Sequence, residues 1–336
     1  NNSNIWKKKS KELNDKENVK IILTEEKKFS KELNPKFKID LSNIKYKNDI
    51  FNIQNNFGSL DYLGLLNRAE NFKFSKFKDI ELLDFEPLFL DNGLVFFDNS
   101  GSIIRYNDNQ KVVWKKNYYS KSEKKNNPKL TFATNNKDLI VIDDFAKFYL
   151  LNINTGELIW SKTNDYPFNS ELKIFKNKFF AIDYKNIIRC FNIKDGSECW
   201  NFKTEDSLMM SGSKYSLIIK NDIVIFNNSV GDITAIDIST GSMIWQIPTQ
   251  SSRINNETHI FKNSRLVNDE NSIYLSNNKN EFFSINLETG TINWINKINS
   301  TLTPILVNDL IFTISSDGYL FTIDKNQGNI LRVNDI

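Results

Sequence analysis

Cysteine and histidine are almost missing from this chain. Its 336 residues include two cysteines and one histidine. Zinc sites draw most of their ligands from these two residue types, so a His/Cys metal site is not expected. A catalytic triad with a histidine base could use only His259, in the polar stretch "NNETHIFKN". We expect His259 to be a surface or partly buried residue, and no residue is assigned a catalytic or metal-binding role.

Long apolar runs and a clear excess of one charge are also missing. No run of 18 apolar residues occurs, so no segment reads as a membrane-spanning helix. The net charge of +3, from 44 basic and 41 acidic residues, lacks the clustered basic excess typical of nucleic-acid-binding proteins. No secretory signal is visible, and the polar opening "NNSNIWKKKS" is typical of a processed start.

A repeated phrase dominates what is present. It appears in full as "NINTGELIW", "NIKDGSECW", "DISTGSMIW" and "NLETGTINW". A fifth copy, "TIDKNQGNILR", has Arg332 in place of Trp, and a shortened early copy ends at Trp114. The glycines, which we expect to close tight hairpins with positive φ, are Gly156, Gly196, Gly241, Gly290 and Gly328.

A second phrase, a polar turn with a short apolar run, precedes each copy of the first. Examples are "NGLVFFDNSGS" and "NDIVIFNNSVGD". Six units of the same internal order result, rich in Ile, Val, Phe and Tyr and bounded by Asn, Asp and Gly. Units of about 40 to 50 residues with about four short strands predict the blades of a β-propeller. The predicted fold class is therefore an all-β propeller of four-stranded antiparallel blades.

The chain divides into three parts on this basis. Residues 1–35 are rich in Lys and Glu and are expected to form a flexible or partly helical arm. Residues 36–75 alternate apolar and polar residues without the repeat phrase, and are expected to pack on the propeller or help to close it. Residues 76–336 contain the six blades.

The recurring tryptophans allow two interpretations. They could form a stacking platform for a flat cofactor, or they could fill the space between neighbouring blades. A cofactor needs one platform, whereas a Trp recurs in most blades, so inter-blade packing is favoured. The residues concerned are Trp114, Trp160, Trp200, Trp245 and Trp294.

The phrase apolar–x–apolar–[Asp/Asn]–x–x–[Thr/Asp]–Gly–x–x–x–Trp resembles the blade signature of propellers related to pyrroloquinoline-quinone dehydrogenases. Within that superfamily the chain most resembles the BamB-type outer-membrane assembly proteins, because a polar arm precedes the first blade and no cofactor cage is visible. The resemblance implies an eight-bladed periplasmic lipoprotein scaffold without a cofactor. It would bind the porin-like core subunit of the barrel-assembly machinery through that subunit's periplasmic domains.

The resemblance also implies a partner-binding stretch. Its family pattern of hydrophobic, any, hydrophobic, basic, Gly falls on "LMMSG", where Leu208, Met210 and Gly212 match in type and Ser211 replaces the basic residue. The family's acidic partner residues have no counterpart in "THIFKNSRL", which carries Lys262 and Arg265 instead. The alternative is that Leu208 to Met210 are core strand residues.

Two alternatives remain for the function and two for the cysteines. A quinone-dependent dehydrogenase would need adjacent cysteines, a calcium site and a catalytic Asp, and the chain has no Cys-Cys pair. A propeller adaptor for another envelope partner is the third hypothesis. If Asn192 and Ser197 close the third hairpin, Cys190 pairs with Cys199, and the two form either a disulfide or two buried thiols.

Overall fold

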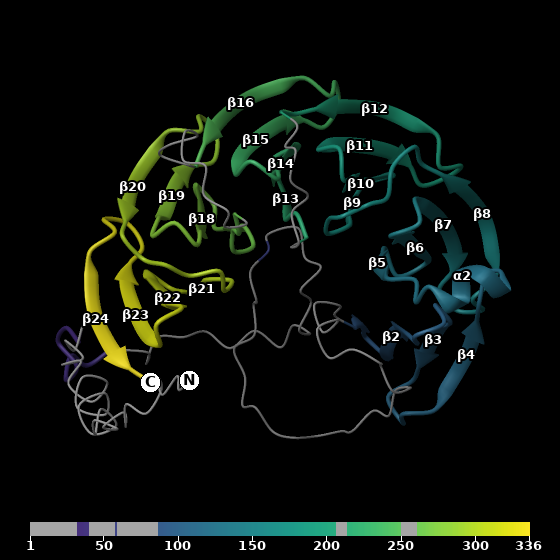
Figure 1. Ribbon diagram of the computed structural model, residues 1–336, viewed down its shortest axis with the longest axis horizontal. Helices are drawn as coiled ribbons and strands as arrows, with labels where there is room; N and C mark the ends of the chain where they lie inside the picture. Colours follow the sequence, from purple (N-terminus) through teal and green to yellow (C-terminus); the bar gives the residue numbers. More distant parts are fainter. Residues whose placement is uncertain (1–31, 40–57, 59–86, 206–213, 250–260) are drawn as a thin grey trace, which may run out of the picture.

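The computed structural model describes residues 32–39, 58, 87–205, 214–249 and 261–336. Six four-stranded antiparallel sheets follow one another around an arc, as Figure 1 shows. This confirms the predicted all-β propeller fold and its six repeats. Among the described residues, no helix has the length and apolar composition needed to cross a membrane.

The first three sheets contain strands β1 to β12, with a short helix between the first and second sheets. In chain order these elements are β1 (Leu88–Leu90), β2 (Gly93–Phe97), β3 (Ile103–Tyr106), β4 (Val112–Lys116), α2 (Lys121–Lys125), β5 (Leu130–Thr134), β6 (Asp138–Asp143), β7 (Lys147–Asn152), β8 (Leu158–Thr163), β9 (Lys173–Phe175), β10 (Lys178–Ile182), β11 (Ile187–Asn192) and β12 (Glu198–Lys203).

The last three sheets contain strands β13 to β24. In chain order these are β13 (Leu217–Lys220), β14 (Ile223–Asn227), β15 (Asp232–Asp237), β16 (Met243–Pro248), β17 (Val267–Asn268), β18 (Ser272–Ser276), β19 (Phe282–Asn286), β20 (Ile292–Asn296), β21 (Ile305–Val307), β22 (Leu310–Ile314), β23 (Tyr319–Asp324) and β24 (Ile330–Asp335). In every sheet the strands pair in chain order, with the first strand innermost and the fourth outermost (Figure 1).

The core lies between the sheets. Each pair of neighbouring sheets encloses one buried hydrophobic cluster. Successive residues of a strand point to opposite faces, so Phe179 packs toward the second sheet and Phe180 toward the fourth. The second and third strands are therefore apolar on both faces, which explains continuous runs such as "DLIVID". The fourth strands face solvent and are mostly exposed.

A polar side chain organises the turn between the second and third strands of a sheet. Asp143, for example, accepts hydrogen bonds from the backbone N–H groups of Phe145 and Lys147, at 2.9 and 2.7 Å. The side-chain oxygen thus replaces backbone partners in the turn. Equivalent turns are organised by Asp98, Asp183, Asn228 and Asn277. This explains the second repeated phrase of the sequence.

Each of the five described tryptophans meets the Gly of the following sheet. The Trp160 indole lies against Gly196, whose φ is +65°, and a Cβ placed there would lie 2.8 Å from the ring. Trp160 Nε1 also donates a hydrogen bond of 2.9 Å to the Ile193 carbonyl oxygen. We call this combination of ring contact and hydrogen bond the Trp–Gly clip. The clips are Trp114–Gly156, Trp160–Gly196, Trp200–Gly241, Trp245–Gly290 and Trp294–Gly328.

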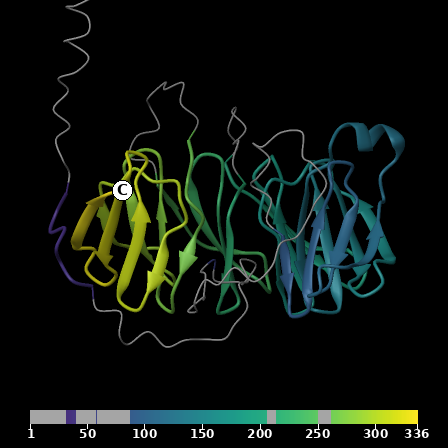
Figure 2. The same ribbon diagram turned by 90° about the horizontal axis from the view of Figure 1, so that it is seen from below.

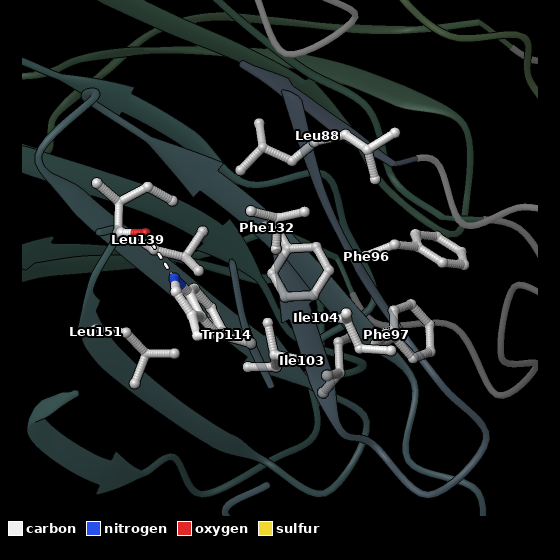
Figure 3. Packing of buried hydrophobic residues seen from close by; sticks show 14 of the residues in the cluster. Leu88, Phe96, Phe97, Ile103, Ile104, Trp114, Phe132, Leu139 and Leu151 are labelled. Atoms are coloured by element: carbon white, nitrogen blue, oxygen red, sulfur yellow. Dashed lines mark hydrogen bonds between the residues drawn. The ribbon is translucent and has the colours of Figure 1, made fainter. Parts of the chain in front are cut away.

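A β-bulge directs each Trp to the following sheet. In the second sheet, Leu151 pairs with Leu158 but Leu150 pairs with Trp160, so Ile159 is the extra residue. Leu150 packs toward the third sheet, and Trp160 therefore does so too. Without the bulge Trp160 would pair with Tyr149, which packs toward the first sheet. Figure 3 shows the outcome one sheet earlier, where Trp114 lies among residues of the second sheet.

The same bulge corrects the predicted pairing of the cysteines. The backbone N–H of Asn192 does bond to the Ser197 carbonyl oxygen, at 2.8 Å, as the sequence suggested. Cys190, however, pairs with Trp200, because Cys199 is the extra residue of the bulge. The prediction that Cys190 pairs with Cys199 was therefore wrong by one residue. Both are free cysteines in the structure, with Cys190 buried between the third and fourth sheets.

Candidate partner-binding face

The four residues predicted to bind a partner lie outside the described residues. Leu208, Met210, Ser211 and Gly212 belong to the stretch 206–213, and His259 lies in the stretch 250–260. Both described flanks of the first stretch are held in place. The Asn186 side chain donates to the Glu205 carbonyl oxygen at 2.7 Å, and Lys214 Nζ donates to Thr131 Oγ1 at 2.9 Å. The "LMMSG" stretch therefore connects two anchored points.

A charged cluster lies beside the second of these anchor points. Its centre is Glu171, whose carboxylate is 3.6 Å from Lys173 Nζ and 3.5 Å from Arg265 Nε. The same carboxylate accepts hydrogen bonds from the Leu217 N–H at 3.0 Å and from the Ser216 hydroxyl at 3.2 Å. The cluster joins the innermost strands of the third, fourth and fifth sheets near their first residues.

Two opposing effects set the charge of Glu171. Burial acts to raise the pKa of its carboxyl, but Lys173, Arg265 and the Leu217 N–H together hold the pKa below its ordinary value. The Lys173 side chain is 2% exposed and that of Arg265 is 31% exposed. Glu171 is thus an ionised, hydrogen-bonded group, and Arg265 is the member of the cluster that solvent or a partner can reach.

The stretch "THIFKNSRL" contains no acidic residue, so the sequence did not predict an acidic neighbour for Arg265. The acid comes from "NSELKIF", two sheets earlier in the chain. No local pattern marks this contact, since Glu171 and Arg265 meet only through the packing of three sheets. The sequence offered only a weak indication of this contact, namely that Glu171 and Arg265 each lie two positions before the first strand of their own sheet.

A second buried polar group escaped the sequence analysis. The Tyr119 hydroxyl donates to Asp143 Oδ2 at 2.5 Å and lies 3.4 Å from the Tyr149 hydroxyl. Burial raises the pKa of the Asp143 carboxyl to about 6, against the hydrogen bonds that lower it. Asp143 is 2% exposed, so the group stabilises the junction between the first two sheets and is closed to a substrate.

The two cysteines do not form the adjacent pair expected of a quinone-dependent dehydrogenase. Cys199 is the extra residue of a bulge in one hairpin, and Cys190, on the opposite strand, is buried between two sheets. Burial and the neighbouring Cys199 raise the pKa of the Cys190 thiol, so it stays protonated. In the described part of the chain, no group of three or more His, Cys, Asp or Glu residues is placed to hold a metal ion.

Four-stranded antiparallel sheets arranged around an arc and joined by recurring Trp–Gly contacts define a β-propeller of the quinoprotein-like repeat type. A model of the family described as outer membrane protein assembly factor BamB matches residues 99–334. The chain belongs to this family.

Individual relatives are distant. Uncharacterized protein RP232 of Rickettsia prowazekii is 20% identical over 290 residues, which cover 81% of this chain and 66% of that protein. The chain thus spans just under two thirds of the length of this relative, and 65% of a second Rickettsia protein.

Solved structures show the same fold. BamB from Moraxella catarrhalis aligns with a TM-score of 0.63 at 17% identity, over 75% of each chain. Quinohemoprotein alcohol dehydrogenase from Comamonas testosteroni aligns with a TM-score of 0.50 at 14% identity, over 61% of this chain and 42% of that one. At these identities the likeness concerns the fold alone.

Proposed function

We propose that this protein is a non-enzymatic scaffold of the barrel-assembly machinery at the periplasmic face of the outer membrane. It binds the periplasmic domains of the porin-like core subunit and so assists the folding and insertion of outer-membrane β-barrel proteins. It contacts the membrane through a lipid attached ahead of the arm, and acts as a monomer within a hetero-complex. The family match over residues 99–334 is the observation on which this proposal rests.

The proposed contact lies at the "LMMSG" stretch. Leu208 and Met210 supply apolar contacts, and Met adapts easily to a partner surface. Gly212 lets the partner backbone approach, while Ser211 supplies no charge. The partly exposed Arg265 belongs to the charged cluster around Glu171 and would supply a positive charge to the partner. Rim charges of this kind govern association rate and specificity more than affinity.

A pull-down from solubilised envelopes of a Gram-negative bacterium tests the proposal. The wild-type protein should recover the barrel-assembly core subunit, and Met210→Asp should lose most of it. Met243→Asp is the matched control, because Met243 lies on a repeated outer strand and is 48% exposed. Recovery of a different envelope protein in place of the core subunit would support the adaptor hypothesis and contradict our proposal.

A quinone-dependent dehydrogenase is the second candidate, favoured by the fold shared with the Comamonas testosteroni enzyme. It is tested by reconstitution with Ca²⁺ and pyrroloquinoline quinone, followed by an alcohol-oxidation assay with an artificial electron acceptor. A tightly bound quinone or steady turnover would overturn the scaffold proposal. We expect neither, because Cys190 and Cys199 lie on the two strands of one hairpin and do not form an adjacent pair.

A further inference from the structure

The outer strand of the last sheet is paired with the arm. Leu33 forms an antiparallel bridge with Val333 of β24, although the two residues stand near opposite ends of the chain. The Leu33 N–H donates to the Val333 carbonyl oxygen at 3.2 Å, and the Val333 N–H donates to the Leu33 carbonyl oxygen at 2.8 Å. Figure 2 shows this segment running beside the sixth sheet.

Side chains extend the pairing on both sides of the bridge. Asn34 Nδ2 donates to the Leu331 carbonyl oxygen at 3.3 Å, and Glu32 Oε1 accepts from the Asp335 N–H at 3.4 Å. Alternate residues of a strand direct their backbone groups to the same edge. The arm therefore reaches three successive outward positions of β24.

Arg332 fixes the far end of the same segment. It occupies the position that Trp has in the other sheets, and its Nη1 donates to the Phe37 carbonyl oxygen at 3.2 Å. In the sixth sheet, Arg at the Trp position thus provides a hydrogen bond to the arm. A Trp side chain directs one donor toward a following sheet, whereas the guanidinium reaches the arm.

Leu33 also borders a cavity of about 500 Å³. Its apolar lining includes Ile298, Phe321, Ile330 and Val333, and its polar rim includes Lys297 and Asp317. Leu33 is 43% exposed, so it covers this apolar surface without filling the cavity.

We propose that residues Glu32–Phe37 are an intramolecular strap that occupies the open edge of β24 and prevents this edge from pairing with a second copy of the chain. An unpaired strand edge presents free N–H and C=O groups, which are a template for pairing with another strand. The strap satisfies the groups at residues 331, 333 and 335 and covers the apolar surface beside them. The partner excluded in this way is the β24 edge of another copy, because antiparallel pairing of two identical edges is self-complementary.

Leu33→Pro in the full chain tests the strap. Proline removes the N–H that bonds to Val333, and Lys38→Pro is the matched control outside the bridge. Hydrogen exchange of the Val333 amide should become faster by about tenfold or more in Leu33→Pro. Sedimentation should then show concentration-dependent dimers, and a synthetic peptide copying residues 29–39 should restore the monomer. A second variant, Asn34→Ala with Arg332→Gln, should act in the same direction without a proline.

Two results would overturn the proposal. The first is unchanged exchange of the Val333 amide in both variants, which would mean that the arm does not hold this edge. The second is faster exchange together with a monomer at every concentration, which would mean that the exposed edge does not self-associate. A dimer in the Lys38→Pro control would also count against it, because proline alone would then be the cause.

Discussion

The five interior junctions of the arc and its two ends are built differently. Each interior junction has a Trp, a bulge before it, and a Gly on the following sheet. At the ends these residues change: Arg332 stands at the Trp position of the last sheet, and Gln110 stands at the Gly position of the first. Both ends keep the backbone conformation, since Gln110 also has a positive φ of 60°.

The hairpin turn of the first sheet differs from the turns of the sheets that follow. The hairpin turn of the first sheet runs from Asn107 to Lys111, one residue shorter than the Asn152 to Glu157 turn of the second. In the described part of the chain, the indole N–H groups donate to turns of the other five sheets. Among the described residues, the phrase is therefore kept where two sheets meet, and it changes at the Gly position of the first sheet and the Trp position of the last.

Removing a tryptophan from an interior junction should have the largest effect. Trp245 is 8% exposed and fills the space between the fourth and fifth sheets, so Trp245→Ala should lower the free energy of unfolding by about 3–5 kcal/mol. Arg332→Ala, at the equivalent position of the last sheet, should cost less than about 1 kcal/mol. Urea unfolding followed by circular dichroism measures both, and equal losses would contradict the difference between interior and end.

The junction between the first two sheets adds a dependence on pH. The pKa of Asp143 is raised to about 6 from an ordinary value of 3.8, so the fold favours the protonated form. This contribution to stability is present below about pH 4 and is lost as pH rises through 6, a change of about 2–3 kcal/mol. Asp143→Asn should flatten the dependence while keeping the turn, as Asn277 does in the fifth sheet. Unfolding midpoints at pH 4 to 7 measure this, and parallel profiles would refute it.

Adding a methyl group at the Gly of a Trp–Gly clip should lower the stability of the fold, whereas the equivalent position of the first sheet already carries a side chain. In Gly290→Ala the new Cβ would lie 2.7 Å from the Trp245 ring, and φ is +72°. Together these should cost about 2 kcal/mol or more. Gln110→Gly should be neutral or stabilising by up to about 1 kcal/mol, because Gly relieves the strained backbone. Thermal melts of the two variants would contradict this account if both lost stability equally.

The hydrogen bond of the clip should contribute least. Trp160→Phe keeps an aromatic ring between the second and third sheets but removes the N–H that bonds to the Ile193 carbonyl oxygen. The expected loss is about 1 kcal/mol, the net contribution of a typical intramolecular hydrogen bond. Urea unfolding measures it, and a loss as large as that of Trp245→Ala would show that the bond rather than the ring holds the sheets.

The six sheets and the positions of their Trp and Gly residues could be predicted from the sequence, because these residues recur at the same place in each repeat. The bulge was not predictable, since its extra residues are not of a single type and most are aliphatic like their strand neighbours: Val113, Ile159, Cys199, Ile244, Asn293 and Leu331. For this reason the sequence predicted that Cys190 pairs with Cys199, whereas it pairs with the next residue, Trp200.

Contacts between segments far apart in the chain could not be predicted from the sequence either. Glu171 meets Arg265 through the packing of three sheets, and Leu33 meets Val333 across almost the whole chain. Neither leaves a local pattern, because such contacts depend on closure of long loops rather than on neighbouring residues. The "LMMSG" stretch was found only through family resemblance, and its role stays a prediction.

The central claim is that the repeated residues build the propeller, while residues between the repeats bind the partner. The most direct test is a titration of the purified periplasmic domains of the barrel-assembly core subunit with wild-type protein, Met210→Asp and Trp160→Phe. We predict that Met210→Asp loses binding with unchanged stability, whereas Trp160→Phe loses stability but binds as the wild type does. Wild-type affinity in Met210→Asp, or weakened binding only in Trp160→Phe, would contradict the claim.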